Sequence, residues 1–132
     1  MEALWPAAHL VPEAFRTALR GLGGLVFLVG VAGFAWMVAT MRKIRTPIHN
    51  SSTPTVLVDG GPFRLTRNPM YLFGSVAYAG LALLLLEPWP LVFLPIVVFV
   101  THYGVVLREE AFLERLFGEP YKRYQTRVRR YL

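Results

Sequence analysis

Cysteine is absent from the 132 residues, which excludes disulfides, thiolate nucleophiles and cysteine-ligated metals. Acidic residues are also scarce, 8 against 14 lysines and arginines, and the formal net charge is +6. There are only three histidines, and His9 and His49 are too isolated to ligate a metal together. We therefore expect no metal site.

Charged residues make up only 17% of the chain and hydrophobic residues 55%, with the charges confined to short blocks. This pattern is typical of a polytopic membrane protein, and the length fits a single domain. A net positive charge can indicate nucleic-acid binding, but here the basic residues flank apolar runs, as expected beside an anionic membrane surface. We expect the membrane, and no nucleic acid, as a partner.

Three apolar runs are candidate membrane spans: residues 21–41, 70–86 and 91–107. The first lacks any charge and has the length of about 20 residues that a membrane helix needs, whereas the second is at the short end of the range. Two prolines within residues 87–90 predict the turn between the second and third runs. The predicted fold is all-α and integral to the membrane, with about three transmembrane helices plus a C-terminal amphipathic helix on the cytosolic face.

We expect one domain over residues 1–132, divided into an N-terminal part (1–41), a polar loop (42–66) and a core (67–132). An interfacial piece is predicted over residues 12–19. Lysines and arginines are concentrated in the loop and after the third run, so the positive-inside rule puts both regions in the cytosol. The predicted location is a bacterial inner membrane with a cytosolic C-terminus, and the loop is expected to act as a lid or a binding wall.

The tail from Arg108 to Tyr131 is predicted to be helical. Its tyrosines and one valine recur three, four and three residues apart between lysines and arginines, at Tyr121, Tyr124, Val128 and Tyr131. This spacing is typical of a basic amphipathic helix lying on a membrane surface.

The pair Asn68-Pro69 predicts the start of the second helix, because Asn is a favoured N-cap and Pro a favoured first helical residue. The backbone N–H groups of Met70 and Tyr71 lie in the first turn, where the helix itself offers no carbonyl acceptor. Together with Arg67 they form a candidate site for a carboxylate or phosphate. The alternative is structural: any membrane helix needs a cap, and an interfacial arginine can simply extend to lipid phosphate.

Glu109 and Glu110 form the second charged cluster, at the end of the third run. Adjacent carboxylates at a helix C-terminus are unfavourable, so we expect Arg108, Arg67 or a bound ammonium as their partner. The alternative is a solvated charged face. His102 lies within the third run, where it can line a pocket, act as a base, or pack with a hydrogen bond to a neighbouring helix.

The motifs of this chain jointly resemble one family. They are Gly61-Pro62-Phe63-Arg64, Arg67-Asn68-Pro69-Met70-Tyr71, Glu109-Glu110-x-x-Leu113 and Phe117-Gly118-x-x-Tyr121-x-x-Tyr124, with an apolar hairpin between the second and third. Over residues 59–132 they are similar to the isoprenylcysteine carboxyl methyltransferases, to which the membrane phospholipid methyltransferases are related. The resemblance implies an integral membrane enzyme that transfers a methyl group from S-adenosylmethionine without a metal.

The donor presents a carboxylate, an ammonium, a sulfonium and a flat adenine, and the residues offer a partner for each. Arg67 with the cap at Asn68, Pro69 and Tyr71 can hold the carboxylate, and Glu109 or Glu110 can pair with the ammonium. Tyr71, Tyr121 or Tyr124 can stack on adenine or face the sulfonium. The resemblance also implicates Glu109 in substrate handling and a nearby arginine in orienting an acidic acceptor, for which Arg108 is the local candidate, and it puts Gly74 beside the donor. Arg67 is the second candidate catalytic residue, and His102 is a candidate for the donor pocket.

Two departures from the family narrow the expected substrate. Asn68 stands where the family commonly has His, so an ionisable imidazole is missing there. Only one run precedes the core, which disfavours a prenylated protein and favours a small lipophilic acceptor or a lipid. Two other classes remain open: a non-catalytic membrane subunit or sensor, and a membrane reductase, for which the chain lacks a phosphate-binding Gly-rich loop after a strand. A homo-oligomer that closes the pocket is also compatible with the sequence.

Overall fold

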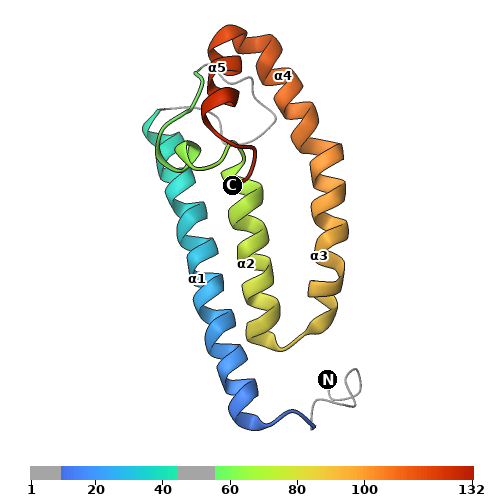
Figure 1. The fold of residues 1–132 in the computed structure, drawn as a ribbon. Helices are drawn as coiled ribbons and strands as arrows, with labels where there is room; N and C mark the ends of the chain where they lie inside the picture. Colours follow the sequence, from blue (N-terminus) through green and yellow to red (C-terminus); the bar gives the residue numbers. More distant parts are fainter. Residues whose placement is uncertain (1–9, 45–55) are drawn as a thin grey trace.

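The computed structural model describes residues 10–44 and 56–132, and the part it describes is helical without any strand (Figure 1). The elements, in chain order, are α1 (Glu13–Lys43), the 3-10 helix η3 (Gly61–Arg64), α2 (Pro69–Leu85), α3 (Pro88–Thr101), the π-helical η4 (His102–Val106), α4 (Leu107–Phe117) and α5 (Glu119–Arg127). In Figure 1, α1, α2 and α3 run along the length of the molecule, while η3, α4 and α5 gather at one end.

Helix α1 is longer than the apolar run that predicts it. It begins directly after Pro12, so the piece predicted over residues 12–19 is part of α1, and its interfacial location stays a prediction. Glu13 lies 3.2 Å from Arg16 and 3.9 Å from Arg20, and these ion pairs let one helix continue through the charged residues. At 1.5 Å per residue, its 31 residues extend about 46 Å.

Glycines let α1 and α2 pack closely, as in many membrane helix pairs. A Cβ added at Gly30 would collide with the backbone of Ala77, and one at Gly80 would collide with the backbone of Phe27. At Gly33 the neighbouring group is the ring of Phe73. The α1–α2 pair is therefore the packed part of the molecule.

A tight turn joins α2 to α3. Leu86 has a positive φ of 58°, and the N–H of Glu87 donates to the Ala82 carbonyl at 2.9 Å. Pro88 then occupies the start of α3, where its missing N–H costs nothing. The chain reverses one residue earlier than predicted, and residues 88–90 already belong to α3.

The helix formed by the third apolar run continues past residue 107. Helices α3, η4 and α4 follow one another as one helix, Pro88–Phe117, so Glu109 and Glu110 lie inside it. The five residues of η4 form a π-helical stretch, a feature that is often found at functional sites. We call Pro88–Phe117 the long helix.

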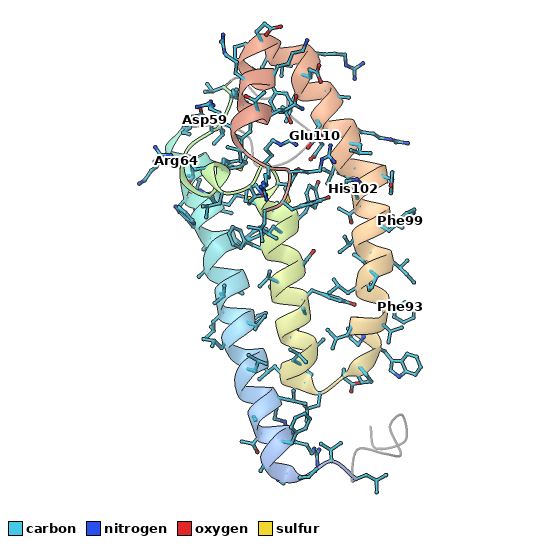
Figure 2. All side chains as sticks on the ribbon, in the orientation of Figure 1. Asp59, Arg64, Phe93, Phe99, His102 and Glu110 are labelled. Atoms are coloured by element: carbon cyan, nitrogen blue, oxygen red, sulfur yellow. The ribbon has the colours of Figure 1, made fainter. Side chains whose placement is uncertain are left out.

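Within residues 10–44 and 56–132, two helices, Glu13–Lys43 and Pro88–Phe117, are long and apolar enough to cross a membrane, and α2 is apolar but has only 17 residues. In the most apolar stretch of the long helix, only 6% of residues are buried inside the protein, so this is not the core helix of a soluble domain. Figure 2 shows Phe93 and Phe99 pointing away from α1 and α2, as lipid-facing side chains would.

The tail differs from its prediction. Helix α5 ends at Arg127, and Val128 is already extended, so the three-four-three spacing does not continue as a helix. The apolar side chains of α5, Tyr121 and Tyr124, are each 2% exposed and pack inside the protein. The amphipathic helix is confirmed, but its apolar face lies against the protein itself.

Candidate functional site

Three segments far apart in sequence meet at the end of the molecule where α2 begins. They are the residues around Thr66–Pro69, the start of α4, and the segment after α5. We call the last of these, Val128–Leu132, the C-terminal segment, and the meeting point the polar end. In Figure 2, Glu110 and His102 lie at or near this end, on the side of the long helix that faces α2.

Asn68 precedes the first residue of α2, as predicted, but its side chain does not cap the helix. Its Nδ2 donates to the Arg130 carbonyl at 3.1 Å, and its backbone N–H donates to Thr66 Oγ1 at 3.1 Å. The Thr66 hydroxyl donates in turn to the Arg130 carbonyl at 2.9 Å. Asn68 therefore ties the start of α2 to the C-terminal segment, and Pro69 is buried beneath it.

Glu110 lies between two arginines. Arg130 donates through Nε to Oε1 at 3.0 Å and through Nη2 to Oε2 at 2.9 Å. Arg67 Nη1 lies 3.3 Å from Oε1. The side chains of Arg67 and Glu110 are 11% and 9% exposed, so this is a nearly buried cluster, and the hydrogen bonds to Glu110 raise the pKa of Arg130.

Glu109, the preceding residue, reaches a different partner. Tyr71 Oη donates to Glu109 Oε1 at 3.3 Å, from the first turn of α2 to the first turn of α4. One turn along α2 from Tyr71, Gly74 is exposed, and no neighbouring atom lies within 4 Å of a Cβ built there. The two clusters predicted from sequence, at Arg67–Tyr71 and Glu109–Glu110, are thus in direct contact.

Tyr121 and Tyr124 are buried, and Tyr124 Oη donates to the Phe63 carbonyl at 2.6 Å. Burial raises the pKa of both hydroxyls, and the charge of Glu110 adds to the effect at Tyr121. Neither ring offers an open face to a ligand in this arrangement. The adenine-stacking role predicted for them stays a prediction, and the bond from Tyr124 to Phe63 holds α5 against η3.

His102 opens the π-helical stretch, and its Nδ1 lies 2.8 Å from Tyr131 Oη in a hydrogen bond. The expected partner was a neighbouring helix, but the C-terminal segment supplies it. Its role beside a donor stays untested.

Sequence reasoning missed Arg130, Tyr131 and Thr66. The two tail residues lie in a run of basic and aromatic side chains that resembles a membrane-surface helix, and Thr66 lies in a loop. Their partners are 20 to 64 residues away in sequence. Local periodicity cannot reveal contacts over such distances. The need of the adjacent Glu109 and Glu110 for a basic partner was the one signal that pointed towards an arginine of the tail.

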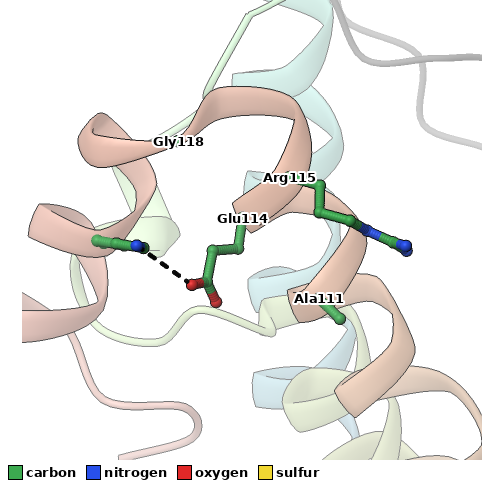
Figure 3. A pocket seen from close by; sticks show the side chains of 5 residues that line it. Ala111, Glu114, Arg115 and Gly118 are labelled. Atoms are coloured by element: carbon green, nitrogen blue, oxygen red, sulfur yellow. Dashed lines mark ion pairs between the residues drawn. The ribbon is translucent and has the colours of Figure 1, made fainter.

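A hollow of about 520 Å³ lies outside the polar end, between α4 and α5 (Figure 3). It is wide open to solvent and is lined by Ala111, Glu114, Arg115, Gly118 and Lys122. The Lys122 Nζ to Glu114 Oε1 ion pair, 3.7 Å, crosses it, and the hollow contains none of the predicted site residues. We assign it no ligand.

Residues 19–120 of the 132 match the family model of the phospholipid methyltransferases. No curated protein and no solved structure matches the chain significantly. The fold and the match define a helical membrane protein of the methyltransferase class. The chain belongs to the phospholipid methyltransferase family, which is related to the isoprenylcysteine carboxyl methyltransferases that its motifs resemble.

Proposed function

We propose that this protein transfers a methyl group from S-adenosylmethionine to a membrane lipid. The observation that carries the proposal is the family match over residues 19–120, in a chain whose charged clusters meet at one end of apolar helices. Arginines and carboxylates are costly near membrane depth, so their presence there favours a function.

The residues at the polar end fit the amino-acid portion of the donor. Arg67 and Arg130 bring two positive charges to the single negative charge of Glu110, and the excess of one suits a carboxylate. The Nε of Arg67 is buried and has no hydrogen-bond acceptor in the described part of the chain, so it is an available donor. Glu109, beside Tyr71, offers a negative charge to an ammonium.

Bound S-adenosylmethionine would supply an electrophilic methyl group carried on a positively charged sulfur. The task of the protein is then to position reactants, which can contribute several kcal/mol to an in-line displacement. Arg67 and Glu109 hold the charged ends, and the ring of Tyr71 suits a neighbouring sulfonium through a cation–π contact. No protein side chain has to form a covalent bond.

A lipid acceptor is favoured over a prenylated protein. The family match is to phospholipid methyltransferases, and the described helices leave wide apolar surfaces open towards the bilayer. The open position at Gly74, one turn from Tyr71, admits an alkyl chain close to the helix backbone. The lipid headgroup determines which atom receives the methyl group, so the experiment compares lipids with different headgroups.

A non-catalytic membrane subunit is the second candidate, and one observation favours it. Arg130 already holds both oxygens of Glu110, and a bidentate ion pair between distant segments can serve the fold alone. Binding of S-adenosylhomocysteine, the product left after the donor loses its methyl group, distinguishes the two candidate functions.

The test is a calorimetric titration of the detergent-purified protein with S-adenosylhomocysteine, followed by transfer of a labelled methyl group to vesicles of phosphatidylethanolamine. Vesicles of phosphatidylcholine, whose headgroup nitrogen is already fully methylated, are the control and should take up no label at that nitrogen. We expect micromolar binding and label in the lipid fraction. Folded protein that gives no heat at high micromolar ligand would instead support the non-catalytic subunit.

Glu109→Gln gives a second, residue-level test. We expect about tenfold weaker binding of S-adenosylhomocysteine, equivalent to about 1.4 kcal/mol, because the carboxylate that pairs with the ammonium is lost. Glu114→Gln, five residues further along α4 and 43% exposed, is the matched control and should change affinity less than twofold. Equal losses in the two variants would contradict a site role for Glu109.

A further inference from the structure

The C-terminal segment is attached to the start of α2 through its backbone. The Arg129 carbonyl accepts from the Arg67 N–H at 3.0 Å, and the Arg130 carbonyl accepts from Thr66 Oγ1 and Asn68 Nδ2. These bonds use main-chain oxygens of the segment. Replacing the side chain of Arg130 therefore leaves all three in place.

The side chain of Arg130 is engaged separately, with Glu110. Its two bonds, 3.0 and 2.9 Å long, form a bidentate pair that uses both carboxylate oxygens. The contact of Arg67 with the same carboxylate, from Nη1 to Oε1, is longer at 3.3 Å. Arg130 is thus the principal partner of Glu110, and Arg67 is the secondary one.

This division leaves Arg67 with hydrogen-bonding capacity. Its Nε is buried without an acceptor among residues 10–44 and 56–132, which is costly unless a ligand supplies one. If Arg130 did not hold Glu110, the carboxylate could accept the bidentate pair from Arg67 instead. Arg67 would then turn its remaining donors away from a ligand.

We infer that Arg130 is a positioning residue for donor binding: it occupies Glu110 so that Arg67 keeps N–H donors for the carboxylate of S-adenosylmethionine. The inference rests on the proposed function. Arg130 touches neither donor nor acceptor in this account, and it acts through Glu110 on Arg67.

The experiment is calorimetric titration of the full-length, detergent-purified protein with S-adenosylhomocysteine. Arg130→Gln should weaken binding about tenfold, and Arg130→Lys should restore part of it, since lysine keeps the charge but makes no bidentate pair. Arg123→Gln, an exposed arginine of α5, removes the same charge and should stay within twofold of the wild type. In the transfer assay, Arg130→Gln should raise the KM for the donor and leave kcat nearly unchanged.

A double variant separates positioning from a merely structural role. Glu110→Gln combined with Arg130→Gln removes one negative and one positive charge. The carboxylate of Glu110 then no longer competes with the donor's carboxylate for Arg67. We expect the double variant to bind S-adenosylhomocysteine within threefold of the wild type, although its thermal midpoint should lie below that of the wild type. If the double variant binds as weakly as Arg130→Gln alone, the inference is wrong.

Circular dichroism and thermal unfolding establish whether each variant is folded. If Arg130→Gln does not fold, Arg130→Lys decides the matter, and an affinity equal to that of the wild type overturns the inference. Absence of binding by the wild type would overturn the proposed function and this inference with it. Binding by the wild type with no loss in folded Arg130→Gln overturns the inference alone.

Discussion

Glu110 and Glu114 lie one turn apart on α4, yet their surroundings are opposite. The Glu110 side chain is 9% exposed and accepts two hydrogen bonds from Arg130, with Arg67 close by. The Glu114 side chain is 43% exposed, and its partner Lys122 lies 3.7 Å away across an open hollow. One helix thus carries a buried, geometrically fixed ion cluster and a solvated ion pair within a single turn.

The difference shows why residue type alone does not define the site. Both carboxylates face basic residues, but only Glu110 connects α4 to the start of α2 and to the C-terminal segment. The hollow beside Glu114 is open to solvent, and none of the residues that line it joins distant parts of the chain. Burial and long-range contacts, rather than charge or volume, distinguish the candidate site.

The strongest test of this comparison is Glu110→Gln. It removes the negative charge that Arg67, 11% exposed, and Arg130, 36% exposed, share, and we expect a loss of about 2 kcal/mol in the free energy of unfolding. Glu114→Gln should cost less than about 1 kcal/mol, because an exposed pair contributes little. Chemical unfolding in detergent micelles measures both, and similar losses would mean that the contrast between the two glutamates is wrong.

Local sequence patterns predicted the elements that depend on local chemistry. Asn68-Pro69 marks the start of α2, and the prolines near residue 88 mark the turn into α3. The proximity of Arg67 to Glu110 followed from the cost of unpaired charges, and it is confirmed at 3.3 Å. Charge pairing therefore carried information about distant residues.

Features that depend on long-range packing were not predictable. The spacing of Tyr121 and Tyr124 indicates an apolar helix face, but it does not say whether lipid or protein covers that face. The side-chain bond of Asn68 goes to the Arg130 carbonyl, a backbone acceptor 62 residues away. The continuity of the long helix through charged residues likewise depends on partners that α2 and the C-terminal segment provide.

Tyr121 and Tyr124 are buried beside the Glu110 cluster, and their ionisation makes the stability of the protein depend on pH. Burial raises the pKa of Tyr121 and Tyr124, so both hydroxyls ionise at a higher pH in the folded protein than in the unfolded chain. Their contribution to stability is complete below the unfolded value of about 10 and is lost as the pH rises from there through the folded pKa. Stability should therefore fall above about pH 10.

Tyr124→Phe should cost about 1 kcal/mol at pH 8, because the Phe63 carbonyl loses its donor at 2.6 Å, and it should flatten the alkaline decline. Thermal midpoints between pH 8 and pH 11 provide the measurement. Tyr103→Phe, at a residue 56% exposed, serves as the control and should leave the alkaline decline intact. An unchanged alkaline decline in Tyr124→Phe would show that its hydroxyl is not held in the buried cluster.

The smallest effect is expected on the exposed side, at Lys122. Its Nζ lies 3.7 Å from Glu114 and 3.8 Å from Glu119, and all three side chains are between 43% and 75% exposed. Lys122→Gln should cost less than about 0.5 kcal/mol, and the cost should vanish in about 1 M salt, where the screening length is about 3 Å. The bidentate contact of Arg130 with the nearly buried Glu110 should be far less sensitive to salt. A loss in the Lys122 variant above about 1 kcal/mol that persists in salt would mean that the ion pairs of Glu110 and Glu114 contribute alike.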